Sequence, residues 1–241
     1  MISSNTRQKH LIEKRLQDIG SSVALFPIIY TLPINKNGIF NMFIAPNFTA
    51  NQWKNLKLEQ NEQDWQKAID IFKSRIESRY IEPVEKLLEI EDELKPSERR
   101  FGFTILAINL LLMETIQAFK DGLETTDGQS KKVFKDFLKS SPHFSPYFTT
   151  DSQRETFYKA FRCGILHQGE IQSSALVWSI GELYERAEGM ETLNRNAVHK
   201  AIKSDLEDYI NGLRNPASES LRAKFRKKMD FLANRQEQVV N

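Results

Sequence analysis

Residues 101–119 read FGFTILAINLLLMETIQAF and form the most apolar stretch of the chain. The uncharged part, residues 101–113, ends at Glu114 after 13 residues, whereas a helix that crosses a bilayer needs roughly 20 apolar residues. The stretch therefore predicts a buried core helix that ends just before Gly122. An unpaired carboxylate is costly to bury, so Glu114 either meets a cation, with Arg162 as a candidate, or lies exposed at the helix end.

Other segments on both sides of this core helix have apolar residues at helical spacing. Residues 62–80 form an amphipathic pattern, and Pro83 suits the first turn of a second, short helix. Ser152 and Glu155 have the spacing of a capping box and open a further helix. Helices are also predicted at residues 5–19, 131–138, 197–213 and 218–233.

Short β-rich runs add strands to this helical plan. Runs at residues 24–32 and 39–45 flank a loop that contains Asn-Gly and predict a hairpin or a pair of short strands. The segment ALVWSI, residues 175–180, predicts a strand with residues 190–193 as its partner. We therefore predict a mainly α fold with small β additions, in which a helical and hairpin-like N-terminal region, residues 1–96, precedes a helical domain, residues 97–241.

The composition is that of an ordinary globular protein, with 40% hydrophobic and 27% charged residues among 241. The 34 Lys+Arg against 32 Asp+Glu leave a net charge of +2, which excludes a histone-like polycation. A single cysteine excludes an internal disulfide framework, and the polar start MISSNTRQKH carries no secretory signal. These features predict a cytoplasmic protein without a membrane-spanning segment.

The sequence carries no pattern for a metal or a cofactor. Its four histidines have no clustered metal-ligand spacing, and the nucleotide-phosphate loops are absent. No G-x-S-x-G elbow of a serine hydrolase is present. We therefore predict no bound metal and no cofactor.

The segment FRCGILHQGE, residues 161–170, combines residue types that suit phosphoryl transfer. An imidazole such as that of His167 can exchange a proton with a ribose 2′-hydroxyl or with a leaving oxygen. The guanidinium of Arg162 stays charged and can hold a phosphate. On a regular α-helix, however, two positions five residues apart diverge by roughly 140°. Cys163 lies four residues before His167 and is either a nucleophile or a buried structural thiol.

At these residues the chain resembles the HEPN superfamily, whose mark is Arg-x4-6-His near a helix end in an all-α bundle. Arg162 and His167 match that mark, and FYKAFRCGILHQGE is similar to a bacterial branch with an RCGLLHQ-type string. The wider resemblance covers about residues 97–235 and implies a HEPN-like helical bundle. Members commonly carry a polar residue directly after the arginine, and this chain departs from that pattern with Cys163.

The resemblance implies a metal-independent endoribonuclease that acts on single-stranded RNA. Arg162 would stabilise the phosphate and His167 would be the general acid or base, leaving a 2′,3′-cyclic phosphate. It also implies a homodimer with both Arg-His couples in one cleft, and an antitoxin or defence-system partner. Some members do not cleave, so the alternative is a non-catalytic module that binds RNA or a protein partner.

Three further features bear on an RNA site. Lys131, Lys135 and Lys139 recur every four residues and form a basic stripe that either follows a phosphate backbone or keeps a surface helix soluble. Tyr158 lies four residues before Arg162, and its hydroxyl is a candidate to line the cleft. The basic cluster in residues 222–228 either binds RNA or pairs with the acidic segment, residues 82–93.

Overall fold

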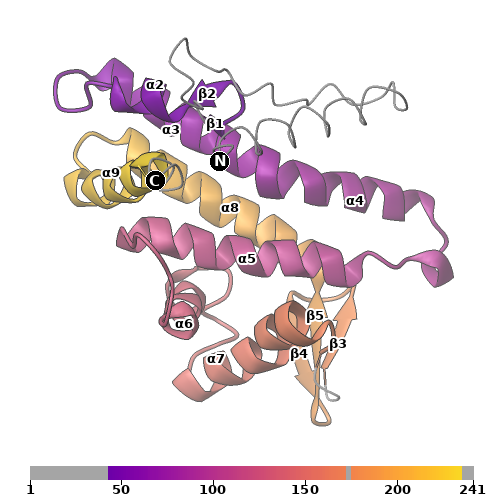
Figure 1. Cartoon of the computed structure of the whole chain (residues 1–241). Helices are drawn as coiled ribbons and strands as arrows, with labels where there is room; N and C mark the ends of the chain where they lie inside the picture. Colours follow the sequence, from indigo (N-terminus) through magenta and orange to yellow (C-terminus); the bar gives the residue numbers. More distant parts are fainter. Residues whose placement is uncertain (1–42, 172–174, 235–241) are drawn as a thin grey trace, which may run out of the picture. The chain divides into compact units, whose positions relative to one another are not determined.

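The computed structural model describes residues 43–171 and 175–234, which are mainly helical with small sheets (Figure 1). This confirms the predicted mainly α fold with small β additions. The helices are α2 (Ala50–Lys54), α3 (Glu62–Ile76), the π-helical η1 (Glu77–Ile81), α4 (Glu82–Glu93), the 3-10 helix η2 (Pro96–Glu98), α5 (Gly102–Asp121), α6 (Ser130–Ser140), α7 (Asp151–Phe157), the π-helical η3 (Tyr158–Gln168), α8 (Arg195–Arg214) and α9 (Glu219–Asn234). The strands are β1 (Phe43–Ala45), β2 (Phe48–Thr49), β3 (Ala175–Trp178), β4 (Tyr184–Ala187) and β5 (Met190–Asn194).

The first long helix runs from α3 through η1 into α4 (Figure 1). The sequence predicts a second helix at Pro83, and α4 does begin there, but no turn separates it from α3. A proline within an α-helix removes one backbone hydrogen bond and clashes with the carbonyl four residues earlier. In η1 the amide of Glu82 instead donates to the carbonyl of Glu77, five residues back. This wider turn accommodates Pro83, so the helix continues.

Helix α5 is the core helix that the sequence predicts, and it contacts α4, α6, α8, α9 and η3. It ends at Gly122, whose φ of 67° is in the left-handed region that glycine adopts without steric cost. Among the described residues, α5 is the one helix long and apolar enough to cross a membrane, but it is mostly buried inside the fold. Its burial is that of a core helix, as the sequence predicts.

Two clusters of aromatic rings hold the helices together. In the first, the ring of Phe72 lies 4.6 Å from Phe119 and 5.4 Å from Phe225, between ring centroids, which joins α3, α5 and α9. In the second, Phe157 lies 5.9 Å from Phe134 of α6 and 4.9 Å from Phe161 of η3. Phe157 and Phe161 are fully buried, as expected of core residues. The second cluster therefore fixes the rotation of η3 about its own axis.

The described strands form two small sheets. β1 pairs with β2, and in the other sheet β5 lies between β3, to which it is parallel, and β4, to which it is antiparallel. This confirms the predicted pairing of residues 175–180 with residues 190–193, whereas β4 was not predicted because the sequence YERA lacks apolar alternation. The hairpin or strand pair predicted in residues 24–45 lies mostly outside the described residues, and the helix predicted at residues 5–19 lies entirely outside them.

The helices on both sides of residue 96 share one core, because α4 contacts α5 and α3 contacts α8. The compact unit that contains them begins at Asn41. The boundary that the sequence suggests near residue 96 therefore falls between two helices that pack together.

The acidic segment, residues 82–93, pairs with α8 rather than with the basic cluster of α9. Glu85 binds Lys203, and Glu91 binds Arg195. The α9 cations instead meet the region around α3, where Arg222 binds Glu62 and lies 4.7 Å from the ring of Trp65. A pairing of these two charged segments within one chain was therefore the wrong expectation, because α8 fills the position beside α4 that α9 would need.

Candidate active site at the end of the π-helix

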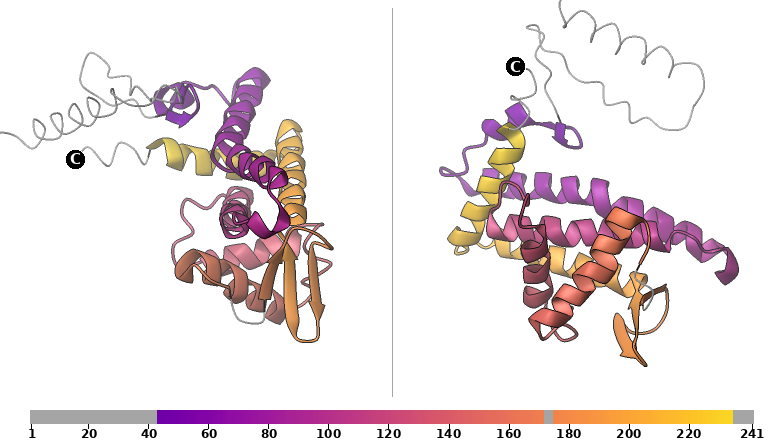
Figure 2. Two further views of the ribbon diagram at one scale, coloured as in Figure 1. Left: turned by 90° about the vertical axis from the view of Figure 1, so that its right-hand side faces the viewer. Right: turned by 60° about the horizontal axis from the view of Figure 1, so that its bottom comes forward.

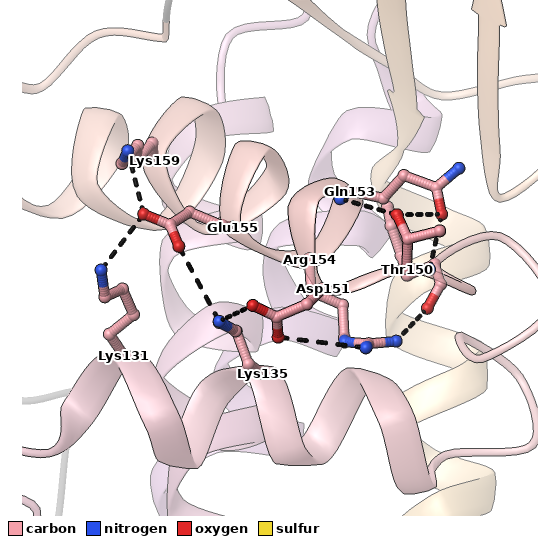
Figure 3. Close-up of polar contacts among 9 residues, drawn as sticks. Lys131, Lys135, Thr150, Asp151, Gln153, Arg154, Glu155 and Lys159 are labelled. Atoms are coloured by element: carbon pink, nitrogen blue, oxygen red, sulfur yellow. Dashed lines mark hydrogen bonds and ion pairs between the residues drawn. The ribbon is translucent and has the colours of Figure 1, made fainter.

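The helix that carries Arg162 and His167 begins at Asp151 and is capped by Thr150. Thr150 accepts from the Gln153 amide at 3.2 Å, and the Gln153 side chain accepts from the Thr150 amide at 2.9 Å (Figure 3). The capping box predicted at Ser152 and Glu155 is thus displaced by two residues, because Thr150 has the extended backbone that an N-cap requires. α7 then continues directly into the π-helical η3.

The π-helical turn removes the geometric objection to the Arg-His couple. Each backbone hydrogen bond of a π-helix spans five residues, so side chains five apart lie on nearly the same side. Nη1 of Arg162 lies 2.8 Å from Nε2 of His167. An arginine only donates, so Nε2 accepts this bond and the proton of the neutral imidazole lies on Nδ1. The imidazole itself is exposed to solvent.

The end of η3 depends on two glycines. Gly169, with φ of 66°, ends the helix in the left-handed conformation, and its amide donates to the carbonyl of Gly164. The amide of Glu170 donates to the same carbonyl at 3.2 Å, which folds the chain back over Gly164. A Cβ at Gly164 would lie 2.5 Å from the carbonyl oxygen of Glu170. The exit of the helix beside His167 is therefore too close-packed for a side chain at position 164.

We expect Gly164→Ala to lower the free energy of unfolding by about 1–3 kcal/mol, because the added methyl displaces backbone rather than a flexible side chain. Urea unfolding measures this change. Gly212→Ala in α8 is the matched control, since its Cβ would meet only the end of the Leu221 side chain, at 3.0 Å. Equal stability of Gly164→Ala and the wild-type protein would contradict the close approach of residues 164 and 170.

Arg162 is held on its other side by a buried carboxylate. Its Nη2 lies 2.9 Å from Oε2 of Glu114, and the two side chains are 11% and 10% exposed. Of the two alternatives for Glu114, the structure thus shows the ion pair. The hydroxyl of Ser130 donates to the same oxygen at 2.8 Å. Sequence reasoning missed Ser130, because nothing in the sequence indicates that the first residue of α6 meets the middle of α5.

Tyr158 lies against the guanidinium of Arg162. The centroid of its ring is 5.6 Å from Cζ of Arg162 and 5.6 Å from the Phe134 ring. Burial, and next a hydrogen bond with Cys163, raises the pKa of the Tyr158 phenol, while a hydrogen bond with Ser130 opposes this. The phenol therefore stays protonated at neutral pH and can donate a hydrogen bond.

Cys163 is half-buried and unbonded to another cysteine. Its hydrogen-bond partner is Tyr158, whereas Nε2 of His167 faces Arg162. A thiol nucleophile needs a base beside it. The arrangement therefore favours the structural alternative for Cys163 over a Cys-His pair.

The predicted basic stripe is largely occupied by contacts within the chain (Figure 3). Lys131 lies 3.1 Å from Glu155, and Lys135 lies 2.7 Å from Asp151, so both tie α6 to α7. Within residues 43–171 and 175–234, Lys139 forms no ion pair. The positive charge of the stripe is thus mostly compensated. The structure brings Glu114, Tyr158, Arg162, Cys163 and His167 together and leaves the lysines outside these contacts.

The remaining described histidines lie elsewhere. His199 is buried in α8, where Nδ1 lies 3.0 Å from Oδ1 of Asn109, and burial lowers its pKa to about 4. The backbone amide of His143 donates to Ser141 in the loop after α6. In the part of the chain that the structure describes, no group of three or more His, Cys, Asp or Glu side chains could hold a metal ion.

The chain was compared with family models, curated proteins and solved structures. No family model, no curated protein and no solved structure matches the chain.

Proposed function

We propose that the chain is a metal-independent endoribonuclease of the HEPN type that cleaves single-stranded RNA at Arg162 and His167. The observation that carries this proposal is the 2.8 Å contact between Nη1 of Arg162 and Nε2 of the exposed His167. A guanidinium and an imidazole in contact supply an anion-binding group and a proton-transfer group at one point of the surface.

In the proposed reaction a substrate phosphate takes the Nη1 donor of Arg162, which frees the lone pair on Nε2 of His167. The imidazole accepts the proton of the ribose 2′-hydroxyl while the 2′-oxygen bonds to phosphorus. The bond from phosphorus to the 5′-oxygen breaks, and that oxygen takes a proton from water or from a second imidazole. The products are a 2′,3′-cyclic phosphate and a 5′-hydroxyl.

Glu114 and Ser130 act as positioning residues in this proposal. Glu114 binds Nη2 of Arg162 at 2.9 Å and leaves Nη1 for the imidazole or the phosphate. Ser130 bonds the same carboxylate oxygen at 2.8 Å and thereby limits its rotation. A guanidinium fixed in advance loses little conformational freedom when it binds the phosphate.

A homodimer and a cytoplasmic location belong to the same proposal. Phe103 and Leu111 of α5 are 39% and 42% exposed. They lie two turns apart on one face of the helix, and Glu114 follows Leu111 by less than one turn. An apolar face beside the couple supports a second copy of the chain at the site, with an antitoxin or defence-system protein as a further partner.

A non-catalytic RNA- or partner-binding module is the second candidate function. The observation that favours it is that three cations already have carboxylate partners within the chain. Arg162 pairs with Glu114, Lys131 with Glu155, and Lys135 with Asp151. This candidate predicts binding that weakens with salt, without any cleavage.

The decisive experiment is incubation of the purified wild-type protein with single-stranded RNA in EDTA. We expect fragments that end in a 2′,3′-cyclic phosphate, because the ribose itself supplies the nucleophile. The matched control is an RNA of the same sequence with 2′-deoxy residues at the mapped cleavage sites, which should resist. Absence of cleavage on any RNA, or equal cleavage of the 2′-deoxy substrate, would remove the proposed function.

A further inference from the structure

The strand β3 lies at an edge of its sheet and carries no charged side chain. The order of the strands is β3-β5-β4, so β3 has a neighbour on one side. In the described residues, 43–171 and 175–234, the backbone of β3 makes hydrogen bonds with β5 alone. An edge of this kind presents unpaired N–H and C=O groups that another strand can extend.

The outer face beside this edge is apolar. Leu176, Trp178 and Ile180 alternate along the chain and are 39%, 47% and 67% exposed, whereas Ala175 on the opposite face of the strand is buried. Met190 of the neighbouring strand β5 is 45% exposed. Apolar side chains at every second position match the spacing at which an added strand places its own side chains.

A pocket of about 240 Å³ adjoins these side chains and has an acidic rim. Trp178, Ile180 and Thr192 line it together with two carboxylates, Glu182 and Glu185. Oε1 of Glu185 accepts a hydrogen bond from the Glu182 amide at 3.0 Å, which fixes the orientation of that carboxylate. Neither glutamate forms an ion pair within the described part of the chain. Carboxylates beside an indole ring suit the side chain of a lysine or an arginine.

We propose that β3 and this pocket bind an extended basic segment of a partner protein, which adds to the sheet as a fourth strand. Its apolar side chains cover Leu176 and Ile180, and one of its cationic side chains enters the pocket between Trp178 and Glu185. This docking site does not depend on whether the Arg162–His167 couple cleaves RNA.

The charges on this surface select the kind of partner. RNA is disfavoured, because its phosphates would meet the carboxylates of Glu182 and Glu185, which form no ion pair in the described part of the chain. A second copy of this chain is disfavoured too, because the β3 strand that it would add carries no cation to meet Glu182 and Glu185. A peptide that presents apolar and basic side chains in turn on one and the same face satisfies the edge, the apolar face and the carboxylates at once.

The probe for this site is a fluorescein-labelled nine-residue peptide, Thr-Val-Thr-Lys-Thr-Val-Thr-Lys-Thr, which presents Val and Lys in turn on one face. Fluorescence anisotropy with the full chain measures its binding. Two matched peptides accompany it: one with Glu in place of Lys, and one with N-methylated backbone amides that cannot extend a sheet. We expect the basic peptide to bind at least about tenfold more tightly than either control peptide. In hydrogen exchange, the basic peptide should protect the amides of β3.

Reversal of the charges at positions 182 and 185 tests whether the peptide binds at this pocket. The double variant Glu182→Lys/Glu185→Lys should lose about tenfold or more in affinity for the basic peptide and gain affinity for the acidic one. Ile180→Asp tests the apolar face separately, at an exposed side chain whose replacement leaves the core intact. The matched controls are Glu93→Lys and Ile90→Asp, which place the same changes at exposed positions elsewhere.

Three results would overturn the inference. The first is no binding of the basic peptide to the wild-type chain. The second is equal loss in the double variant and in Glu93→Lys, or equal binding of the N-methylated peptide. The third is that the wild-type chain sediments as a dimer and the Ile180→Asp variant sediments as a monomer, because the apolar face beside β3 would then bind a second copy of the chain.

Discussion

Arg162→Ala and His167→Ala are each expected to lower the rate of RNA cleavage by about 10²–10⁴-fold, the range typical of losing a proton-transfer group or an oxyanion-stabilising group. The two losses should not add, because Nη1 of Arg162 and Nε2 of His167 are 2.8 Å apart and act on the same phosphate. The measurement is the single-turnover rate on one defined RNA in EDTA, for both single variants and the double variant.

Graded variants separate chemistry from folding in that experiment. Arg162→Lys keeps the charge but lacks the planar fork that directs one nitrogen to Glu114 and the other to the phosphate, so a loss of rate close to that of Arg162→Ala is expected. Glu114→Gln keeps an acceptor for Nη2 and should retain more activity than Glu114→Ala. His143→Ala is the matched histidine control, because His143 lies in the loop after α6. A His167→Ala protein that cleaves as fast as His143→Ala would show that the imidazole takes no part.

Glu91→Ala is expected to lower the free energy of unfolding by about 3–5 kcal/mol, the cost typical of breaking a buried ion pair. Glu91 and its partner Arg195 are 1% and 6% exposed. The same carboxylate accepts hydrogen bonds from the amides of Arg100, at 2.8 Å, and Phe101, at the start of α5. The variant therefore leaves a buried guanidinium and two amides without their partner, at the point where α4, α5 and α8 meet.

Chemical unfolding of three variants checks this expectation. Glu91→Gln keeps an oxygen that can accept from the two amides, so its loss of stability should be smaller than that of Glu91→Ala. Glu93→Ala, two residues away on the exposed side of α4, should stay within about 0.5 kcal/mol of the wild-type protein. If Glu91→Ala were no less stable than Glu93→Ala, the contacts of Glu91 would not support the fold.

Much of the helical plan follows from local patterns in the sequence. The uncharged run before Glu114 predicts the buried helix α5, and Gly122 marks its end, because burial and the left-handed conformation are properties of single segments. The Arg-His couple was found in the same way, from two residue types five positions apart. Only the chemistry of the couple, and not its geometry, could be predicted at that stage.

The charged residues show where local reasoning fails. The four-residue spacing of Lys131 and Lys135 predicts a free basic stripe, but it cannot predict that Asp151 and Glu155 of α7 lie opposite them (Figure 3). Likewise, the basic cluster of α9 meets Glu62 of α3, and α8 lies beside the acidic α4 (Figure 2). Partners that are 16 to 160 residues apart in the chain depend on how the helices pack, which no spacing rule contains.

The sequence by itself determined the core helix, the mainly α class and the two side chains of the candidate site. Only the tertiary structure decided that Arg162 and His167 meet. On an α-helix they would point apart, and it is the π-helical turn that places residues five apart on one side. The buried Phe157 and Phe161 set how that turn rests on the core, and Glu114 and Ser130 then fix the guanidinium. The chemistry of a side chain is a property of the single residue, whereas the relative positions of the side chains in the site arise from packing between helices that are distant in the chain.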